Sequence, residues 1–87
     1  TTCSATALAS PQIVKGSVAL SSGTPSTATI TGISPAFTSS SSYVCTVSEA
    51  TTAANNLLKV ANVSGSSFTI TGPNTVTDVV NYICAGN

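Results

Sequence analysis

The sequence predicts an all-β domain, a small antiparallel β-sandwich or partly open barrel of roughly six to seven strands. Short segments with alternating apolar and polar residues recur along the chain, and Gly, Pro and Ser-rich turns separate them. The 87 residues, 41% of them apolar, suffice for one domain with a thin core. A crossover helix, which parallel strands would need, is not evident.

The first two expected strands, Gln12–Leu20 and Ser26–Gly32, both show a two-residue period. Gly16 inside the first strand predicts a β-bulge or a close approach of backbone. In the second strand, Ala and Ile point one way, and Thr27, Thr29 and Thr31 point the other. Such a Thr row is also typical of surfaces that bind ice or a repetitive polymer, but we favour an ordinary solvent-facing side.

A Ser-rich loop at residues 33–42 follows, and we expect Phe37 to close it onto the core. The third expected strand, Tyr43–Glu49, places Tyr43, Cys45 and Val47 on one side. Ala50–Asn56 is interpreted as a loop, because its Thr and Asn residues disfavour a long helix. The fourth expected strand is Leu57–Val63.

A hairpin turn centred on Gly65 should lead into the fifth strand, Ser67–Thr71, with Phe68 and Ile70 inward. The last expected strand, Val79–Cys84, lacks a clean polar face. It is therefore predicted to lie in the centre of a sheet or to be buried on both faces.

Only 5% of the residues are charged, against about 25% in typical domains. The four are Lys15, Glu49, Lys59 and Asp78. Two cations cannot neutralise a row of phosphates, so we expect no nucleic-acid partner, and no apolar run reaches the length of a membrane span. A neutral Ser/Thr-rich surface favours association, which predicts a homo-oligomer.

The sequence predicts no enzyme, no metal site and no cofactor. His is absent, and the few carboxylates lie outside any recognisable motif. General acid–base catalysis depends mainly on such groups, and a thiol nucleophile would lack an activating base. No CxxC pair is present that could begin a metal site.

Three cysteines leave alternatives open. Cys45 and Cys84, each within an expected strand, are interpreted by preference as separate buried apolar residues. In an oxidising compartment, they are instead candidates for a disulfide. Cys3 then remains as a thiol or a bridge between chains.

Two Ser-, Thr- and Asn-rich connections are our candidates for an exposed recognition surface, because loops often carry function on rigid scaffolds. The candidate residues are Thr38, Ser39, Ser40, Ser41 and Ser42 in the first, and Thr51, Thr52, Asn55 and Asn56 in the second. Asn62 opens an Asn-Val-Ser glycosylation sequon, a short pattern whose use depends on the source of the protein. Tyr43 and Tyr82 are candidates for stacking on sugars, although half-buried packing is the commoner role.

Residues Lys15–Asn87 resemble a C-terminal module of bacteriophage virion proteins that occurs in tail fibres, head fibres and capsid decoration proteins. The matching pieces are Gly65-Ser66-Ser67-Phe68-Thr69-Ile70-Thr71 and Thr77-Asp78-Val79-Val80-Asn81-Tyr82-Ile83-Cys84. The resemblance implies a non-enzymatic β-sandwich, commonly trimeric, that binds a host surface or decorates a capsid. The Cys45 and Cys84 pair departs from this pattern.

Together these observations predict a fibre-tip or capsid-decoration module at the virion surface or outside the cell. Its expected partners are copies of itself, other virion proteins and a host-surface glycan. Residues 1–14 are assigned to an N-terminal arm and residues 15–87 to the domain; the start at Thr1 without Met suggests a processed chain or a fragment. The alternatives are an extracellular filament subunit, polymerised by exchange of the arm, and a lone carbohydrate-binding module with Tyr43 as its platform.

Overall fold

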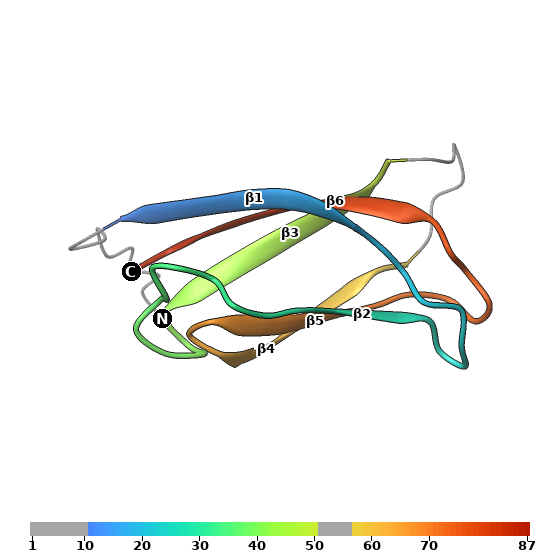
Figure 1. Cartoon of the computed structure of the whole chain (residues 1–87), viewed down its shortest axis with the longest axis horizontal. Coiled ribbons are helices and arrows are strands. Elements are labelled where there is room, and N and C mark those ends of the chain that lie inside the picture. Colours follow the sequence, from blue (N-terminus) through green and yellow to red (C-terminus); the bar gives the residue numbers. More distant parts are fainter. Residues whose placement is uncertain (1–10, 51–56) are drawn as a thin grey trace, which may run out of the picture.

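The chain folds as a sandwich of two antiparallel sheets with three strands each (Figure 1). The structure is a computed structural model that describes residues 11–50 and 57–87. Within these residues, the strands are β1 (Gln12–Ala19), β2 (Thr27–Ile30), β3 (Tyr43–Glu49), β4 (Lys59–Ser64), β5 (Ser67–Thr71) and β6 (Val79–Gly86). The predicted all-β sandwich is confirmed, and the sheets do not close into a barrel.

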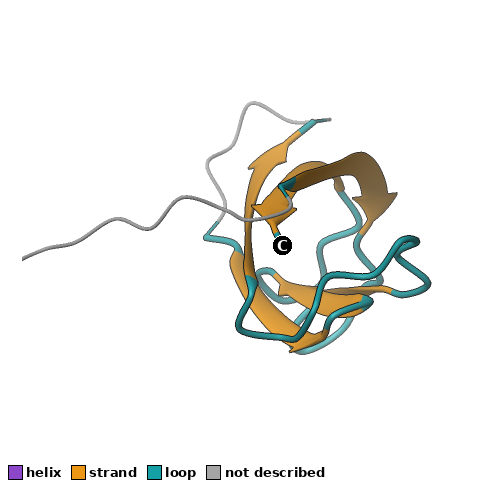
Figure 2. Ribbon diagram, turned by 90° about the vertical axis from the view of Figure 1, so that its left-hand side faces the viewer, coloured by secondary structure: helices purple, strands orange, loops and turns teal. Residues whose placement is uncertain are grey.

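The first sheet has the order β1-β6-β3 and the second the order β2-β5-β4. Their separation into two layers is clear in the end-on view of Figure 2. The prediction that the last strand is central is confirmed, since β6 pairs with β1 on one side and β3 on the other. The other predicted option, burial of this strand on both faces, is wrong, because every second residue (Asn81, Ile83 and Ala85) is exposed. That face went unnoticed because two of its three residues are apolar.

Gly16 lies in an unbroken register with β6, so the expected bulge in this strand is wrong. The close approach is real, but it is made by a side chain: the ring of Tyr82 covers Gly16 from the paired strand. A Cβ added at Gly16 would lie 2.5 Å from the phenol oxygen of Tyr82. The register shift in the described sheets falls instead between Asn62 and Ser64, beside the β4–β5 turn.

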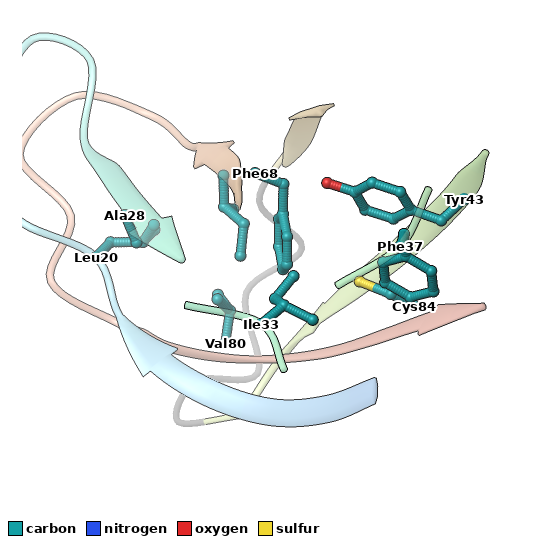
Figure 3. Close-up of a cluster of buried hydrophobic side chains, with 9 residues drawn as sticks. Leu20, Ala28, Ile33, Phe37, Tyr43, Phe68, Val80 and Cys84 are labelled. Carbon is teal, nitrogen blue, oxygen red and sulfur yellow. The ribbon is translucent and has the colours of Figure 1, made fainter. Parts of the chain in front are cut away.

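The core lies between the inner faces of the two sheets (Figure 3). Phe68 and Ile70 from β5 face Val80 and Cys84 from β6, and all four are fully buried. Phe37 closes the 33–42 loop onto this core, as predicted, and its ring stacks on that of Tyr43 at 4.2 Å. The predicted inward positions of Phe68 and Ile70 are therefore confirmed.

Cys45 and Cys84 are joined by a disulfide. They are direct partners on the adjacent strands β3 and β6, with their Cα atoms 4.0 Å apart. The preferred interpretation of two separate thiols is thus wrong, and the alternative, a disulfide between them, is confirmed. Cys3, the third cysteine, lies outside the described residues.

The sheet begins earlier in the chain than the proposed domain boundary. β1 starts at Gln12, so residues 12–14, assigned to the arm, belong to the first sheet. At the other end, β6 continues two residues beyond Cys84 to Gly86. Pro11 precedes β1, and the rest of the arm, residues 1–10, lies outside the described part.

Candidate binding site on the outer face of the first sheet

The side chains of β1, β6 and β3 that point away from the core form what we call the outer face. Antiparallel register sets them in rows that cross the three strands. Three rows span all three strands: Ile13, Ala85 and Val44; Lys15, Ile83 and Thr46; and Ser17, Asn81 and Ser48. A fourth pair, Ala19 and Val79, joins β1 and β6. Across the three full rows, the face changes from apolar to polar.

The first of these rows, Ile13, Ala85 and Val44, is called the apolar row below. Ile13 and Val44 each expose 71% of their surface, although both are large aliphatic residues. Single exposed apolar residues are ordinary, but neighbouring ones on a rigid sheet form a patch. Ile83, 48% exposed in the next row, extends this patch toward the centre of the face.

A groove of about 470 Å³ lies on the same face, and we call it the outer groove. The lining residues are Lys15, Gly16, Ser17, Thr46, Val47, Ser48, Asn81, Tyr82 and Ile83. All nine belong to the first sheet, and they form a block of three residues on each strand. Since the second sheet supplies none of its wall, the groove opens away from the core. Its volume falls within the usual range for small-molecule sites.

Among the described residues, Lys15 is the only charged one that lines the outer groove. Three hydroxyl groups (Ser17, Thr46 and Ser48) and the carboxamide of Asn81 accompany its ammonium group. These groups supply both donors and acceptors, whereas the ammonium group only donates. The second lysine, Lys59, points outward from β4 in the other sheet.

The disulfide joins β3 and β6 directly beside the outer groove. Cys45 precedes Thr46 on β3, and Cys84 follows Ile83 on β6, so the bridge lies on the inner side of the second row. Sites on strands hold their side chains more accurately than sites on loops. The groove is therefore a preorganised surface and not one that forms around a ligand.

The first candidate recognition loop, at 38–42, is an ordered turn. Ser39 N donates to Ser42 Oγ (3.0 Å), and Ser42 N donates to Ser39 O (3.2 Å). The chain end holds the turn in place, because Thr38 N donates to Asn87 O and Asn87 N to Ser42 O. Ser42 is thus partly buried and structural, while Thr38, Ser39, Ser40 and Ser41 remain exposed.

The second candidate loop contains Thr51, Thr52, Asn55 and Asn56, which lie outside the described residues. The residue before this loop is described: Ala50 N donates a hydrogen bond to Val79 O at the start of β6. The first loop is bound to Asn87, just past the end of the same strand. The described hydrogen bonds therefore anchor the flank of the second connection and the first connection at opposite ends of β6.

The sequon residue Asn62 uses its side chain inside the fold. Its Nδ2 donates to Tyr43 O (2.8 Å) and to Ser40 O (3.1 Å). Both amide hydrogens are then engaged, and attachment of a glycan would remove at least one of these bonds. We expect Asn62 of the folded chain to stay unmodified.

Tyr43 is a buried clamp and not a sugar platform. It is 3% exposed, and its hydroxyl lies 2.8 Å from both Ser64 O and Ser67 O in the β4–β5 hairpin. Burial raises the pKa of Tyr43, because the phenolate would lose its hydration. Tyr82 is half-buried and packs edge-on against Phe68, so it offers no open ring either. The sequence-based expectation of an aromatic platform is wrong for Tyr43.

In residues 11–50 and 57–87, no group of three or more His, Cys, Asp or Glu side chains is close enough to hold a metal ion. Nor does this part of the chain contain a helix long and apolar enough to cross a membrane.

No protein-family model matches the chain, and no curated protein or solved structure matches it.

The residues of the outer face were not recognised as a site from the sequence. Lys15, Thr46 and Asn81 lie far apart in the sequence and carry no motif. The sequence does show that Lys15 and Ser17 lie on the same side of one strand, and that Thr46 and Ser48 lie on the same side of another. Only the strand order β1-β6-β3 brings these pairs together.

Proposed function

We propose that the chain is a non-enzymatic structural module of a bacteriophage virion, either a fibre tip or a capsid decoration. It assembles with copies of itself, most simply as a trimer, and joins other virion proteins at the particle surface. The observation that carries this proposal is the apolar row, which leaves two large aliphatic side chains in water on a rigid sheet.

Burial of the apolar row supplies a driving force for assembly. Covering one aliphatic side chain fully contributes about 1.5–3 kcal/mol, so Ile13 and Val44 together contribute several kcal/mol when a neighbouring copy covers them. The row contains no charged residue, and the chain has no net charge. Copies therefore approach one another without long-range repulsion.

The virion assignment draws on the resemblance of two segments, which correspond to β5 and most of β6. These are the central strands of the two sheets. The part of the chain that resembles virion modules thus forms the middle of each layer. A neutral, Ser/Thr-rich surface also suits a subunit packed in a particle.

The test is the native mass at micromolar concentration, measured by size-exclusion chromatography with light scattering. We expect a discrete oligomer for the natural chain and a monomer for Val44→Lys, which places a charge in the apolar row. The matched control is Thr29→Lys, which adds the same charge at an exposed position on β2 and should leave the mass unchanged. A natural chain that is monomeric, or a Val44→Lys oligomer equal to it, contradicts the proposal.

The alternative, a filament subunit, is favoured by one observation. Among the described strands, β1 and β3 are the edges of the first sheet, and an unpaired edge can accept a strand from another copy. Filaments in the electron microscope that disappear when residues 1–10 are deleted would support this alternative. Filaments that persist after the deletion would exclude the arm as the donor.

A further inference from the structure

We propose that the outer groove binds an acidic, N-acylated sugar. This inference names the glycan partner of the virion-surface module and rests on the proposed function for its biological setting. Its physical basis is separate, because it uses the polar rows of the outer face and not the apolar row.

The sign of the ligand charge follows from the lining. Lys15 brings an ammonium group to the outer groove, and within the described part of the chain no carboxylate lines it. A ligand carboxylate therefore gains a charge-assisted hydrogen bond without facing a like charge. A cationic ligand would meet only repulsion from Lys15.

The third row, Ser17, Asn81 and Ser48, matches a polyhydroxylated ring. Its members sit on adjacent strands about 4.8 Å apart, and rows on one face repeat about every 6.7 Å along a strand. The hydroxyls and the carboxamide each donate and accept, as sugar hydroxyls do. The second and third rows together therefore span about the footprint of one pyranose ring, with Ile83 as their apolar member.

The N-acyl group is assigned from Ile83, which lies at the centre of the second row between Lys15 and Thr46. Its side chain is 48% exposed, and on the outer face the polar side chains of Lys15 and Thr46 flank it. An acyl methyl group that covers Ile83 buries apolar surface on both partners. A sugar with both a carboxylate and an acyl group can use Lys15 and Ile83 together.

The outer groove and assembly do not compete for the same residues. The apolar row lies one row nearer the start of β1, and none of its three members lines the groove. Ser17, Asn81 and Ser48 lie two rows away from the apolar row, so burial of the apolar row does not require them.

The experiment is an NMR titration of the uniformly ¹⁵N-labelled chain with N-acetylneuraminic acid. We expect shifts concentrated at residues 15–17, 46–48 and 81–83, with a dissociation constant on the order of 1 mM, typical of one small ligand on an open site. Lys15→Gln should weaken binding about fivefold, as loss of an exposed ion pair does. Lys59→Gln is the matched control: it removes the same charge from the opposite sheet and should change binding less than twofold.

Two further sugars separate the contributions. N-acetylglucosamine lacks the carboxylate and glucuronic acid lacks the acyl group, so each should bind several-fold more weakly than N-acetylneuraminic acid. No shifts in the groove, or equal weakening by Lys15→Gln and Lys59→Gln, would overturn the proposal. A stronger response of the same amides to a Glu-rich peptide would assign the groove to a protein partner and likewise overturn it.

Failure of this inference is distinguishable from failure of the proposed function. A discrete oligomer with an unresponsive groove leaves assembly intact and removes the sugar site. A monomer whose groove binds the sugar retains the site and removes the assembled virion module.

Discussion

Reduction of the Cys45–Cys84 disulfide should cost a large share of the stability of this domain. The bridge joins residues 39 positions apart, and a loop of that length loses about 13 cal/mol/K of entropy in the unfolded chain. At 25 °C this corresponds to about 4 kcal/mol. The free energy of unfolding of an 87-residue chain is typically roughly 4–13 kcal/mol. The disulfide therefore supplies between a third and nearly all of that stability.

The assay is urea unfolding followed by far-ultraviolet circular dichroism, with and without a phosphine reductant. We expect the reduced chain to lose about 4 kcal/mol and to unfold with a steeper urea dependence, because its unfolded state exposes more surface. The double variant Cys45→Ala, Cys84→Ala is the control, since it should respond to the reductant by less than about 0.5 kcal/mol.

A loss below about 1 kcal/mol on reduction of the natural chain would refute the entropy argument. The pairing itself is checked by alkylation of the denatured, unreduced chain. Because the structure joins two of the three cysteines, at most one thiol should react. Reaction of two or three thiols would show that the bridge is absent.

Two other substitutions test the hairpin clamp and a strained turn. Tyr43→Phe should cost about 1–3 kcal/mol, because Ser64 O and Ser67 O lose their donor. Burial raises the pKa of Tyr43 above its ordinary value of 10.0, so the natural chain should lose stability as the pH rises past about 10, while the Phe variant loses less; equal alkaline slopes in urea titrations would contradict this. Thr75 is a β-branched residue at φ 56°, so Thr75→Gly should stabilise the fold by about 0.5–1 kcal/mol in thermal unfolding. A lower melting temperature for this variant would show that Thr75 is not strained.

The strands were predictable because each is defined by its own neighbours in sequence. Tyr43–Glu49 and Ser67–Thr71 occur with the predicted bounds, and Phe68 and Ile70 point inward as predicted. The alternation of apolar and polar residues shows that one face of a strand is buried, and it can be recognised within a single strand. Phe37 was also placed correctly, since a lone aromatic residue in a polar loop gains most by reaching the core.

The interactions between strands were not predictable in the same way. Gly16 suggested a bulge because the sequence does not show that Tyr82 lies beside it on the next strand. Cys45 and Cys84 suggested two thiols for the same reason. Each wrong prediction concerns a pair of residues far apart in the chain. The two-residue alternation within one strand does not show which residue of another strand lies beside it.

The sequence by itself determined the all-β class, the residues that share a face in most strands and the near absence of charge. Only the tertiary structure decided the strand order β1-β6-β3, the disulfide and the rows of the outer face. The physical reason is that alternation depends on the direction of successive side chains, whereas register depends on the packing of the whole core. A shift of one residue between β1 and β6 would bring Ile13 and Lys15 to the inside, and the partly buried Val14 and Val18 oppose it through their packing against the core.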